Sequence, residues 1–286
     1  MDKYLNLKLV QGNKTLDLNN NYKIIDIEGI DFPELELNTS SNAHYDGSIV
    51  DSKRVDKRYI SIQAEYKGPN KEIERKNLIS FFNPKNKGIL IIDYCGTLRS
   101  IEYEIEEFNS KIVNIHEDLI FMVNLLCANP YFNEVMESKI EIALWNGAFH
   151  FPLVIPKNKG IIVGFRSPSL IVNVNNTGDV QSGMIIEFRA LGSLTNPSLF
   201  NINSRESIKI NKSMVAGEII KVNTSSGKKK VVQKLNGVEV NIMNLLDLNS
   251  EFLQLSVGDN LFRYNADSNI DNLEVSIYYN PAYLGV

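Results

Sequence analysis

Short runs in which apolar and polar residues alternate recur along most of this 286-residue chain. The clearest run is "RYISIQAEY", residues 58–66, in which alternate positions are apolar and the positions between them are mostly polar. A period of two is the signature of a strand that buries one face. Turn-forming stretches such as "PKNKG", "NNTGD", "TNPS" and "SSGK" separate many of the runs. The pattern predicts a mainly β protein with many antiparallel connections.

One stretch of the first half departs from this period. In "KEIERKNLISFF", residues 71–82, apolar residues recur at helical spacing, and Pro84 follows. This predicts one amphipathic helix. The runs "GILIIDY" and "RSIEYEIEEF" then flank Gly96 and predict a hairpin, and residues 119–128 predict one more strand.

The length favours two domains, because a domain usually has about 100 to 200 residues. The composition becomes polar around Pro130, in "NPYFNEVMESKI", so we expect residues 1–135 and 136–286 to form separate domains. The first would be a β-sandwich with one packed helix, and the second an all-β sandwich of jelly-roll type. Near its end, residues 253–257 and 262–264 predict a hairpin whose turn is Gly258–Asn260.

Charge and composition exclude several classes of function. Thirty basic and thirty-four acidic residues give a net charge of −4, which disfavours nucleic-acid binding. No secretory signal is expected at the start, and no apolar run approaches the roughly 20 residues of a membrane span. Cys95 and Cys127 stand among apolar residues and are expected to be free, buried thiols in a reducing cytoplasm.

The acidic run Glu102, Glu104 and Glu106 places three carboxylates on one face of the predicted strand. A metal site, or a glycosidase that also uses Asp259, would need such carboxylates, but any strand shows water a similar polar face. No metal-binding spacing of His and Cys, no nucleophile elbow and no phosphate loop is present. We therefore predict no enzyme, and no catalytic, cofactor-binding or metal residue.

Three aromatic residues offer an alternative function. Trp145, Phe149 and Tyr264 have faces that can stack on sugar rings or fill a core. The alternative is a carbohydrate-binding β-sandwich module for attachment to a cell wall.

The order of several segments carries a resemblance to a known family. "HYDGSIVDSKRVDKRYISIQAEYKG" precedes the helix, the two strands follow it, and "FMVNLLCANPYF" closes the first domain. This order resembles the distal tail proteins of long-tailed bacteriophages. The second half, ending in "FLQLSVGDNLFRYNAD" and "LEVSIYYNPAYLGV", is similar to the C-terminal β-sandwich of the same family.

The resemblance implies a structural protein of the virion, the distal tail or baseplate hub of a phage or prophage. It implies a first domain similar to tail-tube subunits that forms a hexameric ring, and a galectin-like second domain. The implied partners are a tail-tube protein, a tail-tip or tail-associated protein, and a receptor-binding protein or cell-wall saccharide. The implied location is the tail tip, after assembly in the cytoplasm of the bacterial host.

A ring also needs contacts between subunits, and the first domain offers opposite charges for them. The basic side chains are Lys53, Arg54, Lys57 and Arg58, and the acidic ones are Glu102, Glu104, Glu106 and Glu107. We predict that these two groups meet across neighbouring subunits.

Overall fold

The computed structural model describes residues 5–19, 21–41, 44, 46–111, 117–141, 144–147, 164–167 and 171–286. The chain divides into two compact units, Met1–Val135 with Ala282–Val286, and Met136–Pro281. The sequence analysis assigned residues 136–286 to the second domain, whereas in the structure residues 282–286 belong to the first unit. The prediction of a mainly β chain is confirmed.

The first unit is built on nine strands, seven of them in the order β2-β1-β7-β8-β9-β6-β3, while β10 pairs with β8 and β25 pairs with β10. The strands are β1 (Leu5–Gln11), β2 (Lys14–Asp17), β3 (Tyr22–Glu28), β6 (Arg58–Tyr66), β7 (Gly88–Tyr94), β8 (Thr97–Lys111), β9 (Leu119–Cys127), β10 (Phe132–Asn133) and β25 (Ala282–Tyr283). Strands β6 and β7 coincide with the alternating runs of the sequence.

The long strand β8 changes partner along its length. Residues up to Tyr103 pair with β7, and residues from Glu104 onward pair with β9. The register with β9 shifts between Ile105 and Glu107, where a bulge lets the strand bend. The two halves of the sheet therefore share one strand and enclose one core.

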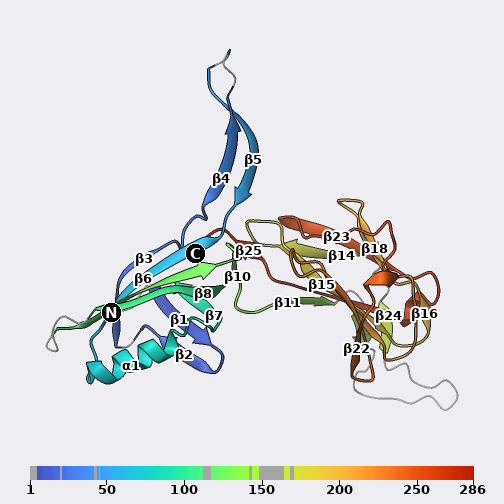
Figure 1. Cartoon of the computed structure of the whole chain (residues 1–286). Coiled ribbons are helices and arrows are strands. Elements are labelled where there is room, and N and C mark those ends of the chain that lie inside the picture. Colours follow the sequence, from blue (N-terminus) through green and yellow to red (C-terminus); the bar gives the residue numbers. More distant parts are fainter. Residues whose placement is uncertain are drawn as a thin grey trace. The chain divides into compact units, whose positions relative to one another are not determined.

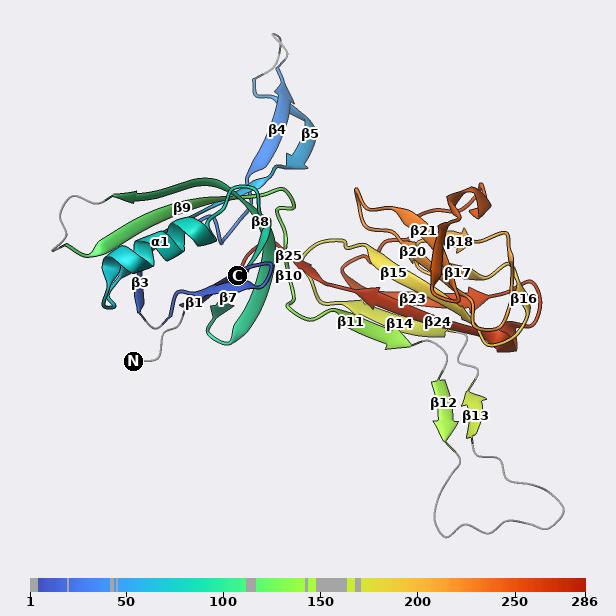
Figure 2. The ribbon, with the colours of Figure 1, turned by 60° about the horizontal axis from the view of Figure 1, so that its bottom comes forward.

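The helix α1 (Lys71–Phe81) occupies the place predicted for it and lies along the sheet (Figure 2). It buries Leu78 and Phe81 in the core of the first unit. Just beyond its end, the ring of Phe82 stacks on Phe108 at 4.8 Å between centroids. The apolar spacing of the helix thus serves to cover the core. No helix in the described part of the chain is long and apolar enough to cross a membrane.

Arg58, at the start of β6, is only 2% exposed. Its Nε donates a hydrogen bond to the carbonyl oxygen of Pro130 at 2.7 Å, and its Nη1 donates to that of Gly29 at 2.7 Å. Nη1 also lies 3.4 Å from the carbonyl oxygen of Asp31, and Nη2 donates to that of Leu284. Burial lowers the pKa of Arg58. The prediction that Arg58 contacts a neighbouring subunit is therefore wrong, because main-chain oxygens of its own unit enclose it.

The end of the chain is fixed to the first unit at the same place. β25 pairs with β10, where Tyr283 lies opposite Phe132. The guanidinium of Arg99 lies 3.5 Å from the centre of the Tyr283 ring, and the Tyr283 hydroxyl donates to Glu134 Oε1 at 2.8 Å. The chain therefore leaves the first unit and re-enters it through two adjacent segments.

The second unit has two main sheets, of order β11-β24-β15-β20-β21-β22 and β14-β23-β17-β18. Both contribute to one core, for example through Phe188 and Phe262, so the unit is a β-sandwich as predicted. Their strands are β11 (Ser138–Glu141), β14 (Ile171–Asn176), β15 (Met184–Ala190), β17 (Ser198–Asn201), β18 (Ser207–Lys209), β20 (Ile219–Asn223), β21 (Lys230–Leu235), β22 (Val238–Asn241), β23 (Gly258–Asn265) and β24 (Leu273–Tyr279). Shorter elements are β12 (Leu144–Gly147) paired with β13 (Gly164–Ser167), β16 (Leu194–Thr195) paired with β19 (Ser213–Met214), and the 3-10 turns η1 (Met243–Leu245) and η2 (Ile270–Asn272).

The predicted hairpin around Gly258–Asn260 is wrong. These residues begin β23, which pairs with β14 and β17, and residues 251–257 contribute only an isolated bridge between Leu255 and Ser182. The side-chain amide of the buried Asn260 donates to the carbonyl oxygens of Ser256 and Gly258 at 2.8 and 2.9 Å. The turn therefore precedes Asn260, and Gly258 supports it with a φ of 85° that favours glycine.

The environment of Arg58 generates a prediction about stability. Replacing Arg58 by Met leaves buried carbonyl oxygens unpaired, and each costs about 1 to 3 kcal/mol, so the first unit should lose at least about 3 kcal/mol. Arg54→Met is the matched control, because Arg54 is exposed and its ion pair contributes at most about 1 kcal/mol. Urea denaturation of both variants checks this, and equal losses would contradict the role of Arg58.

The two thiols differ, contrary to the expectation that both are buried. Cys127 is buried, whereas Cys95 is exposed in the turn between β7 and β8. Burial raises the pKa of the Cys127 thiol to about 12, against the opposing effect of the Arg58 charge.

At pH 8 we expect an aromatic disulfide reagent to titrate one thiol per native chain and two per denatured chain. Rapid titration of two thiols in the native chain would show that the core is open.

Candidate assembly surfaces

A two-stranded hairpin extends from the sheet of the first unit (Figure 1). It consists of β4 (Leu35–Ser40) and β5 (Ile49–Val55), which pair only with each other. We call this hairpin the arm. Every residue of β4 is exposed, and so is every residue of β5 except Val55.

The two faces of the arm have different chemistry. On one face, Glu36 pairs with Arg54 at 2.9 Å and Asn38 Nδ2 donates to Ser52 Oγ at 2.9 Å, so its polar groups are largely satisfied within the hairpin. The other face carries apolar side chains and one cation. Its members are Leu35, Leu37, Thr39, Val50, Lys53 and Val55, as the register of the two strands shows.

The apolar face of the arm is left open to solvent. Leu35, Leu37 and Val50 are 43%, 49% and 45% exposed. Complete burial of such a side chain contributes about 1.5 to 3 kcal/mol, and an isolated two-stranded hairpin is only marginally stable in water. A partner that covered this face would gain part of that free energy and would order the arm.

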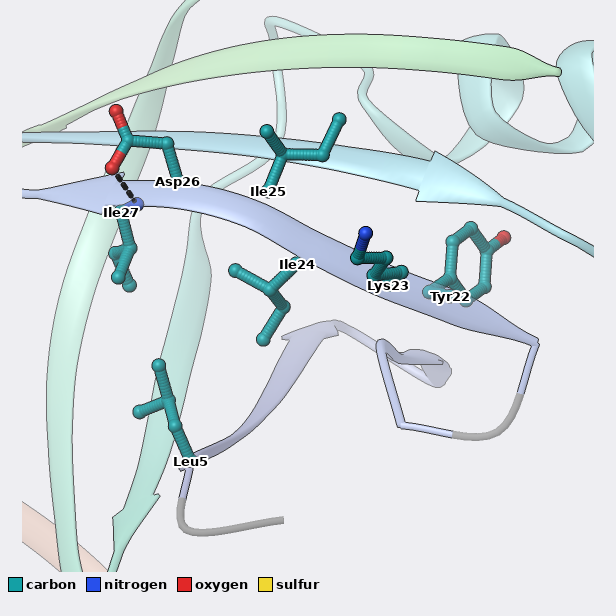
Figure 3. Close-up of a pocket in the computed structure, with 7 residues that line it drawn as sticks. All are labelled: Leu5, Tyr22, Lys23, Ile24, Ile25, Asp26 and Ile27. Atoms are coloured by element: carbon teal, nitrogen blue, oxygen red, sulfur yellow. Dashed lines mark hydrogen bonds between the residues drawn. The ribbon is translucent and has the colours of Figure 1, made fainter. Parts of the chain in front are cut away.

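A second exposed feature is the edge of the sheet at β3, where the strand order ends. A hollow of about 540 Å³ is lined by Leu5 and by Tyr22–Ile27, and we call it the β3 seam (Figure 3). The register shift between Ile24 and Asp26 places Ile24 and Ile27 on the side of the strand that faces Leu5 (Figure 3). The Asp26 carboxylate accepts a hydrogen bond from the Ile27 main chain at 2.9 Å and so satisfies part of this edge.

A third feature is a groove of about 460 Å³ on the outer face of the sheet, where β8 passes from β7 to β9. Val10 lies opposite Ile89, and Ile89 lies opposite Glu102, in one row across three strands. The neighbouring row, Leu9, Leu90 and Ile101, is buried in the core, so the first row faces outward. Its full lining is Val10, Gly12, Lys87, Gly88, Ile89, Glu102, Tyr103, Glu104, Leu126, Ala128 and Asn129, and we call it the outer-face groove.

The four basic residues that were predicted to form an interface have different environments in the structure. Arg58 is buried, and Arg54 pairs with Glu36 in its own hairpin. The Lys57 amine lies 5.0 Å from the centre of the Tyr59 ring. Lys53 is exposed on the apolar face of the arm and forms no ion pair within the described residues. Of the four basic residues, Lys53 is therefore the best placed to contact a neighbouring subunit.

The acidic residues Glu102, Glu104, Glu106 and Glu107 all lie exposed along β8. Glu104 pairs with Lys87 at 2.9 Å, and Glu107 accepts a hydrogen bond from Asn124 Nδ2 at 3.2 Å. Within the residues that the structure describes, no group of three His, Cys, Asp or Glu side chains could hold a metal ion. Glu102 and Glu104 both line the outer-face groove, and Glu102 lies opposite the exposed Ile89.

Of the three aromatic residues considered for sugar binding, only Tyr264 has a described side chain. Tyr264 is 3% exposed and lies in the core of the second unit, so its ring cannot stack on a sugar. The backbone of Trp145 lies in β12. Phe149 lies outside the described residues.

The sequence reasoning missed the arm and the surroundings of Arg58. The alternation in "ELELN", residues 34–38, and "IVDSKRV", residues 49–55, was a usable signal for the arm. No local signal existed for Arg58, because its acceptors at Gly29, Pro130 and Leu284 are main-chain atoms from distant segments.

Part of the second unit is similar to a known protein family. Residues 177–283 match the family model described as the C-terminal domain of the siphovirus-type tail component. The comparison with curated protein sequences gave no significant match.

Two solved structures share the fold over nearly the whole chain. The crystal structure of the Dit protein of phage SPP1, described as a paradigm of the hub adsorption apparatus in phages that infect Gram-positive bacteria, has a TM-score of 0.68 at 14% identity. It covers 97% of this chain and 99% of that one. The baseplate of phage P2 in its activated conformation with calcium gives a TM-score of 0.55 at 11% identity, with 96% and 97% covered. The family model and the shared fold confirm the predicted resemblance to distal tail proteins.

The exposure of the arm generates a prediction about local stability. In the isolated subunit, amide hydrogens of β4 and β5 should exchange with deuterium much faster than those of β6, because β6 is paired on both sides within the sheet. Hydrogen exchange followed by mass spectrometry measures both segments in one experiment. Equal protection of β5 and β6 would show that the arm is already covered.

Proposed function

We propose that the chain is the hub protein of a phage tail tip and that its first unit closes into a ring of six copies. The observation that carries the proposal is the arm, an amphipathic hairpin whose apolar face is left exposed by the described residues of the first unit. A protein with the fold of tail hubs and such a surface is suited to repeated contacts with copies of itself.

A closed ring uses one surface of each subunit to bind a different surface of the next. The apolar face of the arm is the surface with which each subunit would bind the next. The β3 seam and the outer-face groove are two candidates for the surface that would receive it. Apolar contact would supply most of the free energy, since exposed ion pairs contribute only about 0 to 1 kcal/mol each.

The remaining contacts of the proposed hub are with other tail proteins. We assign one side of the ring to the tail-tube protein and the other to a tail-tip protein. The second unit would carry a receptor-binding protein or contact a cell-wall saccharide, and its edge strand β22, with Val238 and Val240 exposed, supports a binding role. The proposal requires no catalysis and places the protein in the virion after assembly in the host cytoplasm.

Native mass spectrometry of the purified full-length chain tests the ring. We expect a species of six times the mass of the 32.4 kDa chain. Leu35→Gln with Leu37→Gln should weaken assembly by at least about tenfold, because both changes remove apolar contact area from the centre of the proposed interface.

Ile49→Gln is the matched control, because Ile49 is also exposed on the arm but lies opposite Ser40 on the polar face. It should assemble like the wild type. A wild-type chain that stays monomeric at every concentration would contradict the proposed ring, and equal effects of the two sets of changes would contradict the role of the apolar face.

A further inference from the structure

We infer that residues 282–286 act as a latch, which closes the first unit at the root of the arm and can do so only after the second unit has been synthesised. We call these five residues the latch, and residues 29–31, which precede the arm, its root. The inference concerns the folding of the first unit, and only its consequence for assembly rests on the proposed ring.

On one side, the latch pairs with the short strand β10. Ala282 lies opposite Asn133, and Tyr283 lies opposite Phe132. In the described part of the chain, the one other strand pairing of β10 joins Asn133 to Ser100. Without the latch, β10 would keep only that single bridge to the sheet.

On the other side, the latch lies against the root of the arm. The main-chain nitrogen of Val286 donates to the carbonyl oxygen of Ile30 at 3.2 Å. Gly285 packs so closely on Asp31 that a Cβ at this position would overlap the Asp31 carbonyl oxygen. The latch therefore holds the root of the arm and β10 together, although these segments are far apart in the sequence.

Arg58 makes the closed state depend on the latch. Its guanidinium is buried among carbonyl oxygens of Gly29 in the root, Pro130 before β10, and Leu284 in the latch. Removing the latch takes away the acceptor of Nη2. A buried cation with an unsatisfied donor is costly, so the unlatched unit should favour an open root in which water reaches Arg58.

The order of synthesis gives the latch a further consequence. The second unit spans Met136–Pro281, and its strand β24 pairs with both β11 and β15, so the unit is completed just before the latch is made. Domains usually fold in the order of their synthesis. Here the first unit would close last. An incomplete chain would keep an open root and, given the proposed ring, would be excluded from the hub.

The thiol of Cys127 reports on closure, because Cys127 is buried and lies opposite Arg58 in the pairing of β6 with β9. The test uses full-length chains that carry Cys95→Ser, which removes the exposed thiol. Gly285→Ala should raise the rate at which a maleimide labels Cys127 by at least about tenfold, because the added methyl lifts the latch from Asp31.

Gly183→Ala is the matched control. Its added methyl also meets main-chain atoms, those of Ser225, but in the second unit, so the labelling of Cys127 should not change. Hydrogen exchange should show that Gly285→Ala exposes the root and β10 while the second unit keeps its protection. Equal labelling rates in the two variants, or loss of protection in both units of Gly285→Ala, would overturn the inference.

Chains held on the ribosome test the order of closure. Each carries all 286 residues followed by a flexible linker, and the linker length sets how much of the chain has emerged. Cys127 should be labelled rapidly when the chain has emerged as far as Pro281, and should become protected once residues 282–286 are outside. Protection of Cys127 when only residues 1–135 have emerged would overturn the inference.

Mixing experiments test the consequence for assembly. In native mass spectrometry, Gly285→Ala should enter rings with wild-type chains at least about tenfold less than Gly183→Ala does. Equal entry of the two variants would overturn the exclusion of unlatched chains. A wild-type chain that stays monomeric would overturn the proposed ring, while the labelling of Cys127 would still decide whether the latch exists.

Discussion

The first unit depends on one buried cation, Arg58, whose guanidinium is held by main-chain carbonyl oxygens. Arg58 hydrogen-bonds main-chain oxygens from the segment that leads to the arm, from the segment that leaves for the second unit, and from the returning end of the chain. Burying a guanidinium is costly unless its donors are satisfied, so these segments must stay together for the unit to fold. One side chain thereby fixes the root of the arm and both connections to the second unit.

This arrangement explains why the arm can remain uncovered while the rest of the unit is well packed. The sheet and α1 enclose a core that needs no partner. No residue of β4 or β5 belongs to the buried part of that core. An anchored hairpin with an open apolar face can bind a neighbour without unfolding its own subunit. Assembly would then draw its free energy mainly from apolar contact.

The sequence predicted those elements whose evidence is local. Strand β6, strand β7 and helix α1 follow directly from periods of two and of about 3.6 residues. Long-range pairing was not predictable in this way. Residues 253–257 alternate and bury Leu253 and Leu255, but they do not form a strand. Cys95 is exposed because it lies in a turn, although its neighbours in the sequence are apolar. The acceptors of Arg58, and the return of Tyr283 to β10, join segments that no local pattern connects.

The central claim is that the first unit forms the hub by placing its arm on the next copy. Electron cryomicroscopy of the assembled full-length protein tests it most directly. The account predicts six-fold symmetry, with β4 and β5 of each copy covered by its neighbour. Arms that project freely into solvent, or that fold back on their own subunit, would contradict it.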